Sequence, residues 1–163
     1  MIHQVEGDIL LSNAQAIAHG VRVNDPMDKG LALALHNQYP GMHKDFHHWC
    51  HQNKPEPGDA WLWGGPNGVR IINLITQEGL DSHDHRLGKA TLSNVNHALR
   101  ALAKIIDKES ISSLAIPKLA TGIGGLDWDD VRPLLETHLG ELDIPVYLYS
   151  TYHADQKAQE PNA

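Results

Sequence analysis

The chain has 163 residues, one cysteine and a formal net charge of −7, with 41% hydrophobic and 20% charged residues. This composition favours one compact globular domain, and the acidic balance argues against a broad nucleic-acid-binding surface, which needs clustered Lys and Arg. The single Cys50 excludes an internal disulfide framework, and no apolar run is long enough to span a membrane. With no secretory signal visible near Met1, we expect a cytoplasmic protein.

The first half of the chain alternates short strands with helices. In chain order, we predict strands at 2–7 and 14–21, helices at 28–40 and 42–53, and strands at 59–64 and 69–76. Pro40 ends the first helix, and the Gly-Pro-Asn-Gly turn at 65–68 indicates a hairpin between the last two strands.

The second half begins with the clearest helix. In chain order, we predict a helix at 91–107, a strand at 112–117, a helix from near Asp130 and a strand at 144–149. The buried face of the first helix is predicted from apolar residues at helical spacing, namely Leu92, Val95, Leu99, Leu102 and Ile106. Pro133 places the start of the next helix, because proline is tolerated in a first turn. The polar tail 153–163 is expected to fray.

This alternation predicts an α/β fold, with a largely parallel sheet covered by helices on both faces. We expect one domain at 1–152, followed by the tail 153–163. Ligands of such sheets bind at the carboxyl ends of the strands. Two glycine-containing loops fall there, at 21–30 and 116–128.

The second of these loops contains three glycines between an apolar strand and a helix. Backbone N–H groups freed by glycine, together with a helix N-terminus, can hold phosphate without lysines. The alternative is a simple tight turn. The loop is not a Walker A sequence, because no Gly-Lys-Ser/Thr follows, and it lies too late in the chain for the Rossmann motif.

Five stretches in a fixed order resemble the macrodomain family of ADP-ribose-binding folds. They are VEGDIL at 5–10, IAHGV with MDKGLALAL at 17–35, YPGMHKDF at 39–46, GDAWLW at 58–63 and IPKLATGIGGLDWDDVRPLL at 116–135. The resemblance covers roughly residues 2–150 and is strongest to the branch with terminal ADP-ribose glycohydrolase, DNA ADP-ribosyl glycohydrolase antitoxins and ADP-ribose-1″-phosphate phosphatases. It implies a three-layer α/β/α sandwich around a mixed, mostly parallel sheet.

The resemblance also implies a ligand site. Asp8 would accept the adenine amino group, the Ile9 amide would meet the ring, and Tyr147 or Tyr149 would flank it. The loop of Thr121, Gly122, Ile123, Gly124, Gly125 and Leu126 would hold the pyrophosphate. Around the distal ribose we expect His19, Met27, Lys29, Gly30 and Leu31. The alternatives are a turn residue at the end of a strand for Asp8 and simple core packing for the tyrosines.

Whether the chain is an enzyme stays open. The glycohydrolase relatives depend on a lysine and an aspartate, where this chain has Gln77 and Gly124. A second route would use His19 as a base and Asp28 to position water, for a hydrolase or a phosphatase. Lys89, and His83 with His85, are further acid–base candidates. The competing hypothesis is a non-catalytic ADP-ribose reader in which His19 is a structural residue and Asp28 a surface one.

A third possibility is metal binding by a histidine face. His43, His47 and His51 are spaced by four and lie near Cys50, which suits zinc or nickel. The alternative is a solvated helix face, and we expect no resident metal or cofactor. The expected partner is ADP-ribose or an ADP-ribosylated macromolecule, with nucleic acid a partner only when ADP-ribosylated and no membrane contact. A scaffold without a ligand would leave both glycine loops unexplained.

Overall fold

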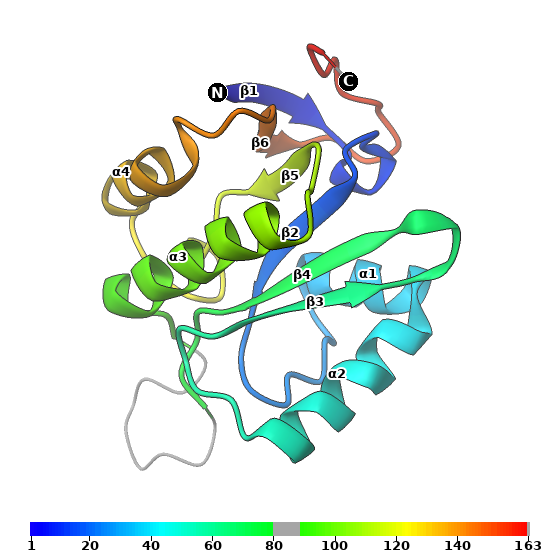
Figure 1. The fold of residues 1–163 in the computed structure, drawn as a ribbon, viewed down its shortest axis with the longest axis vertical. Helices are drawn as coiled ribbons and strands as arrows, with labels where there is room; N and C mark the ends of the chain where they lie inside the picture. Colours follow the sequence, from blue (N-terminus) through cyan, green and yellow to red (C-terminus); the bar gives the residue numbers. More distant parts are fainter. Residues whose placement is uncertain (80–88, 163) are drawn as a thin grey trace.

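Six strands form one mixed sheet at the centre of the molecule (Figure 1). The structure is a computed structural model that describes residues 1–79 and 89–162. The strands are β1 (Ile2–Gly7), β2 (Ala16–Val21), β3 (Ala60–Gly64), β4 (Arg70–Ile75), β5 (Leu114–Pro117) and β6 (Val146–Tyr152), in the order β1-β6-β5-β2-β4-β3. All neighbours are parallel except β3 and β4, which form the predicted hairpin. The mixed, mostly parallel sheet is therefore confirmed.

Helices cover both faces of this sheet, so the three-layer α/β/α architecture is confirmed (Figure 1). They are α1 (Gly30–Gln38), α2 (Pro40–Asn53), α3 (Leu92–Lys108) and α4 (Trp128–Leu139), with 3₁₀ turns η1 (Ile9–Leu11) and η2 (Pro66–Gly68). Successive side chains of β4 point to opposite faces of the sheet. Ile72 and Leu74 pack with α3 and α4, whereas Ile71 and Ile75 pack with α1 and α2. No helix within the described ranges is long and apolar enough to cross a membrane.

Several element boundaries differ from the prediction. The helix predicted at 28–40 begins only at Gly30, because the preceding residues form a loop that is held by hydrogen bonds to the Asp25 carboxylate, and it ends at Gln38. The last strand continues to Tyr152 because it keeps pairing with β1 through Gly7. Leu92, expected on the buried face of α3, is 39% exposed. It is the first residue of the helix, directly after the N-cap Thr91.

Helix α4 begins two residues earlier than predicted. Its first residue is Trp128, not Asp130, because the Asp127 carboxylate accepts a hydrogen bond from the Asp129 amide at 3.1 Å and caps the first turn. Pro133 therefore lies in the second turn and not the first. The helix starts directly after the glycine loop, so the loop lies at its N-terminal end.

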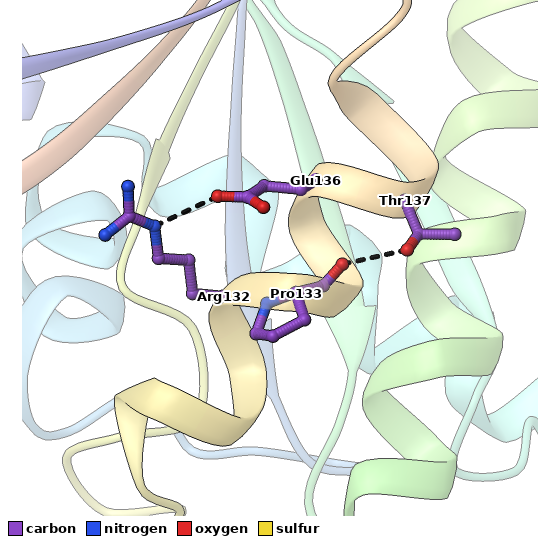
Figure 2. Close-up of polar contacts among 4 residues, drawn as sticks. All are labelled: Arg132, Pro133, Glu136 and Thr137. Atoms are coloured by element: carbon purple, nitrogen blue, oxygen red, sulfur yellow. Dashed lines mark hydrogen bonds and ion pairs between the residues drawn. The ribbon is translucent and has the colours of Figure 1, made fainter.

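Two side-chain contacts lie beside the proline in the second turn of α4 (Figure 2). Proline has no N–H to donate, which removes one helical hydrogen bond. The Thr137 hydroxyl donates to the carbonyl oxygen of Pro133 at 2.9 Å, and Arg132 pairs with Glu136 at 3.0 Å along the same turn. Both contacts are exposed, so they hold the local turn and contribute little to global stability.

The C-terminal segment 153–162 packs against the sheet, in contrast to the expectation that it frays. The His153 amide donates to the Gly7 carbonyl at 3.1 Å, and the Asp8 amide donates to the Gln156 carbonyl at 2.7 Å. The segment thus runs beside the end of β1, as its position in Figure 1 shows. The order of this polar segment comes from hydrogen bonds to backbone groups that the strand ends leave available.

Candidate functional site

Two adjoining cavities open at the carboxyl ends of the parallel strands. One has a volume of about 300 Å³ and is lined by the ends of β2 and β5 and the loops that follow them. The other, about 390 Å³, is mostly apolar and lies beside η1, α1 and β6. Gly30, Leu31 and Pro117 line both, so the two cavities form one elongated cleft. We call them the polar cavity and the apolar cavity.

Most of the expected ligand-binding residues meet at this cleft. The polar cavity is lined by His19, Asp28, Lys29, Gly30, Leu31, Gly122, Ile123 and Gly124. The apolar cavity is lined by Ile9, Gly30, Leu31 and Tyr149. The remaining members of the expected set line neither cavity: Asp8, Met27, Thr121, Gly125, Leu126 and Tyr147. Between the two tyrosines, Tyr149 is therefore the one that contributes a wall.

The glycine loop is a tight turn with donors left over. A Cβ on Gly124 would lie 2.6 Å from the Ala120 carbonyl oxygen, so no larger residue fits without moving the backbone. The Leu126 amide donates to that same carbonyl at 2.9 Å. Within residues 1–79 and 89–162, the amides of Gly122, Ile123 and Gly124 donate to no backbone acceptor. These groups are a donor surface at the polar cavity, while Asp127 occupies the first turn of α4.

The loop after β2 forms the opposite wall of the polar cavity. Asp25 holds it in shape, because its carboxylate accepts from the Met27 amide at 2.8 Å and from the Arg22 amide at 3.2 Å. Met27 has a φ of 52° and its side chain is fully buried among α1 and α2. The loop therefore presents Asp28, exposed at the rim, while Met27 anchors it.

Two histidines beneath this loop fix its carbonyl groups. His47 Nε2 donates to the Asp25 carbonyl at 3.0 Å, and His36 Nδ1 donates to the Met27 carbonyl at 3.3 Å. The His43 ring lies between them, with ring centroids 4.0 Å from His36 and 4.4 Å from His47. Burial, and then the two neighbouring histidines, lower the pKa of His43.

The predicted histidine face is thus divided. His43 and His47 support the loop together with His36 from α1, whereas His51 is exposed and outside this stack. Among the described residues, no three His, Cys, Asp or Glu side chains are arranged to hold a metal ion. Cys50 is buried, and burial raises the pKa of its thiol.

His19 is a buried imidazole at the wall of the polar cavity. It is 2% exposed, and its Nε2 lies 2.7 Å from the Asn73 side-chain oxygen on β4. With the Asn73 amide in this orientation, Nε2 carries the proton and Nδ1 is an acceptor, which is buried and has no partner among the described residues. Burial lowers the pKa of His19 below its ordinary value, which favours the neutral ring. The group can accept a proton or a hydrogen bond.

The remaining residues weighed for catalysis differ in their relation to the cleft. Gln77 is buried, lines the polar cavity and forms an isolated bridge with Ala90. Lys89 is exposed and lines neither cavity, and only its stem comes near Gly125. His83 and His85 lie outside the described residues.

Sequence reasoning missed several residues of the cleft. They include Arg22, Asp25 and Lys118 at the polar cavity, and Leu10, Ala34 and Tyr152 at the apolar cavity. Arg22 and Asp25 lie in the loop already expected to bind, so their charge was a usable signal. The alanine and Tyr152 give no signal in the sequence, because only the fold brings them to the cleft.

Fold and cleft together define an α/β/α protein suited to an elongated ligand with one apolar end and one polar or anionic part. A model of the Macro domain family matches residues 18–135. The chain belongs to that family.

Two curated relatives and one solved structure extend the comparison. The chain is 29% identical over 157 residues to the DNA ADP-ribosyl transferase–DNA ADP-ribosyl glycohydrolase fusion protein of Thermosipho africanus, with 89% of this chain and 40% of the relative covered. It is 30% identical over 155 residues to the DNA ADP-ribosyl glycohydrolase of Mycobacterium tuberculosis, covering 91% and 42%. The structure of Thermosipho africanus DarTG in complex with ADP-ribose matches with a TM-score of 0.81 and 26% identity over 96% of this chain and 42% of that chain. The chain thus spans about two fifths of the length of these proteins.

The glycine loop gives a direct test of the cleft's backbone geometry. We expect Gly124→Ala to lower the free energy of unfolding by about 1 to 3 kcal/mol, because its Cβ would press on the Ala120 carbonyl. Gly122→Ala is the matched control, since a Cβ there meets nothing within 4 Å. Urea denaturation of both variants measures the difference. Equal stability of the two variants would contradict the loop conformation.

The histidine stack predicts an acid-sensitive fold. Because the pKa of folded His43 lies below 6.5, the unfolded chain binds more protons as the pH falls through that value, and stability drops. We expect His43→Phe to flatten the fall of the melting temperature between about pH 7 and pH 5. Part of the slope remains, because the pKa values of His19 and His138 are also lowered. An unchanged slope in His43→Phe would show that the stack does not titrate in this way.

Proposed function

We propose that the chain binds ADP-ribose, free or attached to a macromolecule, along the cleft. The observation that carries this proposal is the junction of an apolar and a polar cavity through Gly30, Leu31 and Pro117. Adenine is flat and largely apolar and suits the apolar cavity. The diphosphate suits the amides of the glycine loop, and the distal ribose suits the end of the polar cavity near His19.

The charges around the polar cavity support an anionic ligand despite the net charge of −7. Arg22, Lys29 and Lys118 line it, and the two carboxylates there are Asp25 and Asp28. The Asp25 carboxylate is already bonded to two backbone amides of its own loop. The local balance therefore does not repel a diphosphate in the way that the whole-chain charge suggests.

The relatives support the same ligand class. Two are described as DNA ADP-ribosyl glycohydrolases, and one solved structure holds ADP-ribose. For this chain we propose an ADP-ribosylated macromolecule as a partner, with DNA one form of it. Two expectations stay predictions: that Asp8 contacts adenine, and that the protein is cytoplasmic.

The calorimetric titration of ADP-ribose tests the proposal, with Ala34→Trp as the blocking variant. Ala34 lines the apolar cavity on a partly exposed position of α1, so the indole fills the proposed adenine end without entering the core. We expect wild type to bind saturably, and Ala34→Trp to bind at least about tenfold more weakly, or about 1.4 kcal/mol. Leu33→Trp is the control, because the neighbouring Leu33 is exposed and lines neither cavity.

Two results of this titration would contradict the proposal. Wild type without detectable binding in calorimetry and in thermal-shift measurements would show that ADP-ribose is not the ligand. Equal affinities of wild type and Ala34→Trp would place adenine outside the apolar cavity.

Hydrolysis of the ADP-ribosyl bond is a second candidate function, favoured by the unpartnered Nδ1 of His19. A water oxygen would bond to the anomeric carbon of the distal ribose while the bond to the carried group breaks and its electron pair leaves with that group. His19 Nδ1 would take the water proton, and the leaving group would take a proton from solvent. Asp28 at the rim would position the water. Gln77 and Gly124 line the same cavity and supply neither an amine nucleophile nor a carboxylic acid.

Release of ADP-ribose from an ADP-ribosylated substrate measures this activity. We expect His19→Gln to lower the rate by about a hundredfold while ADP-ribose affinity stays within about threefold. The wild-type rate should stay on its plateau to below pH 6.5 and then fall as His19 is protonated, since burial lowers its pKa. A wild type that binds ADP-ribose but releases none would leave the reader function alone.

A further inference from the structure

The C-terminal segment 153–162 is built into the end of the cleft that carries the apolar cavity. Its backbone lies against Gly7, where a Cβ would be 2.8 Å from both the Ala158 amide nitrogen and the Gln156 carbonyl oxygen. Gly7 also has a φ of 152°, so glycine is required there for two reasons. Gly7 lines the apolar cavity, which places the segment directly behind that wall.

The Asp8 side chain is held from two directions. Its Oδ1 accepts from the Leu10 amide at 3.0 Å, and its Oδ2 accepts from the Asp155 amide at 3.0 Å. Asp8 is 4% exposed, so its carboxylate has one fixed orientation. One of its two fixed contacts is supplied by the C-terminal segment. Leu10, the other donor residue, lines the apolar cavity.

The Glu160 carboxylate links the segment to the cleft through three hydrogen bonds. Its Oε2 accepts from the Ser12 hydroxyl at 2.5 Å and from the Tyr149 hydroxyl at 2.7 Å. Its Oε1 accepts from the Asn13 amide at 2.9 Å. One carboxylate therefore joins β6 to the residues that follow η1, through charge-assisted bonds. Burial, followed by the bond to Glu160, raises the pKa of the Tyr149 hydroxyl.

The segment has little apolar attachment of its own. Ala158 packs with the cluster around Val5, Ile9 and Tyr149, and the Tyr147 hydroxyl donates to the Pro161 carbonyl. The core between the sheet and the helices contains no other residue of the segment. Loss of the segment should therefore loosen one end of the cleft and leave the remaining fold in place.

We propose that Glu160 is a positioning residue for ligand binding: its carboxylate fixes the Tyr149 ring and the 8–13 loop in the arrangement that forms the apolar cavity. The inference rests on the proposed function, because the ligand part that it affects is the adenine of ADP-ribose. Tyr149, Ile9 and Leu10 are three walls of this cavity, and two of these three belong to the 8–13 loop. The segment is thus a part of the binding site without touching the ligand.

Calorimetric titration of ADP-ribose into Glu160→Ala and Glu160→Gln tests the inference. We expect Glu160→Ala to weaken binding by about tenfold, and Glu160→Gln to weaken it less, because the amide keeps one acceptor oxygen. Lys157→Ala is the control: Lys157 is exposed in the same segment and lines neither cavity. Thermal unfolding of each variant, and Glu160→Gln in particular, separates loss of the site from loss of the fold.

A double-mutant cycle gives a readout that general destabilisation would not move. If Glu160 acts through Tyr149, then Tyr149→Phe and Glu160→Ala each weaken binding, and the double variant binds within about twofold of Glu160→Ala alone. A chain ending at Tyr152 should match or exceed the loss seen for Glu160→Ala.

Each remaining outcome decides against the inference. Wild-type affinity in Glu160→Ala and in the shortened chain would show that the segment does not shape the cavity. Tighter binding in these variants would make the segment a strap that obstructs the cleft, the opposite of a positioning element. Additive losses in the cycle would refute the route through Tyr149. If the wild-type protein does not bind ADP-ribose, the proposed function itself is refuted. If the wild-type protein binds ADP-ribose and the variants bind it equally well, only the inference about Glu160 is refuted.

Discussion

The parallel pairing of β2 with β5 determines where the cleft lies. Ala16 pairs with Leu114 and Ile17 with Ala115, so the two strands run side by side and end at the same edge of the sheet. The loop with Asp28 follows the first strand, and the glycine loop follows the second. Because both loops leave the same edge, they face each other across the polar cavity. The hydrogen-bond ladder of the sheet thus determines the position of the two loops that line the polar cavity.

The proposed diphosphate site is compatible with an acidic chain because most of the expected binding groups are backbone amides. The glycine loop offers donors without adding charge, and its geometry depends on the contact between Gly124 and the Ala120 carbonyl. Lys118 adds a cation at the polar cavity and lies 5.6 Å from the centre of the Trp128 ring. Cation and amide donors therefore meet at the start of α4, although Asp127 occupies the helix cap.

The layers of the fold and the two loops that line the polar cavity could be predicted from the sequence. Periodic apolar residues such as Val95 and Leu99 indicated α3, and the three glycines indicated the turn after β5. Contacts between segments that are distant in the sequence could not be predicted from it. The bond from the Asp155 amide to Asp8 joins residues at opposite ends of the chain, and no local pattern encodes it. His36 was overlooked for the same reason, because it meets His43 across two helices and not along one.

The proposed placement of ADP-ribose along the cleft, with its diphosphate on the glycine loop, is tested most directly by amide chemical-shift mapping during an ADP-ribose titration. We expect saturable shifts of the Gly122, Ile123 and Gly124 amides, together with Ile9 and Leu31 at the apolar end. Shifts confined to the surface around His51, or no saturable shift at the glycine loop, would contradict it.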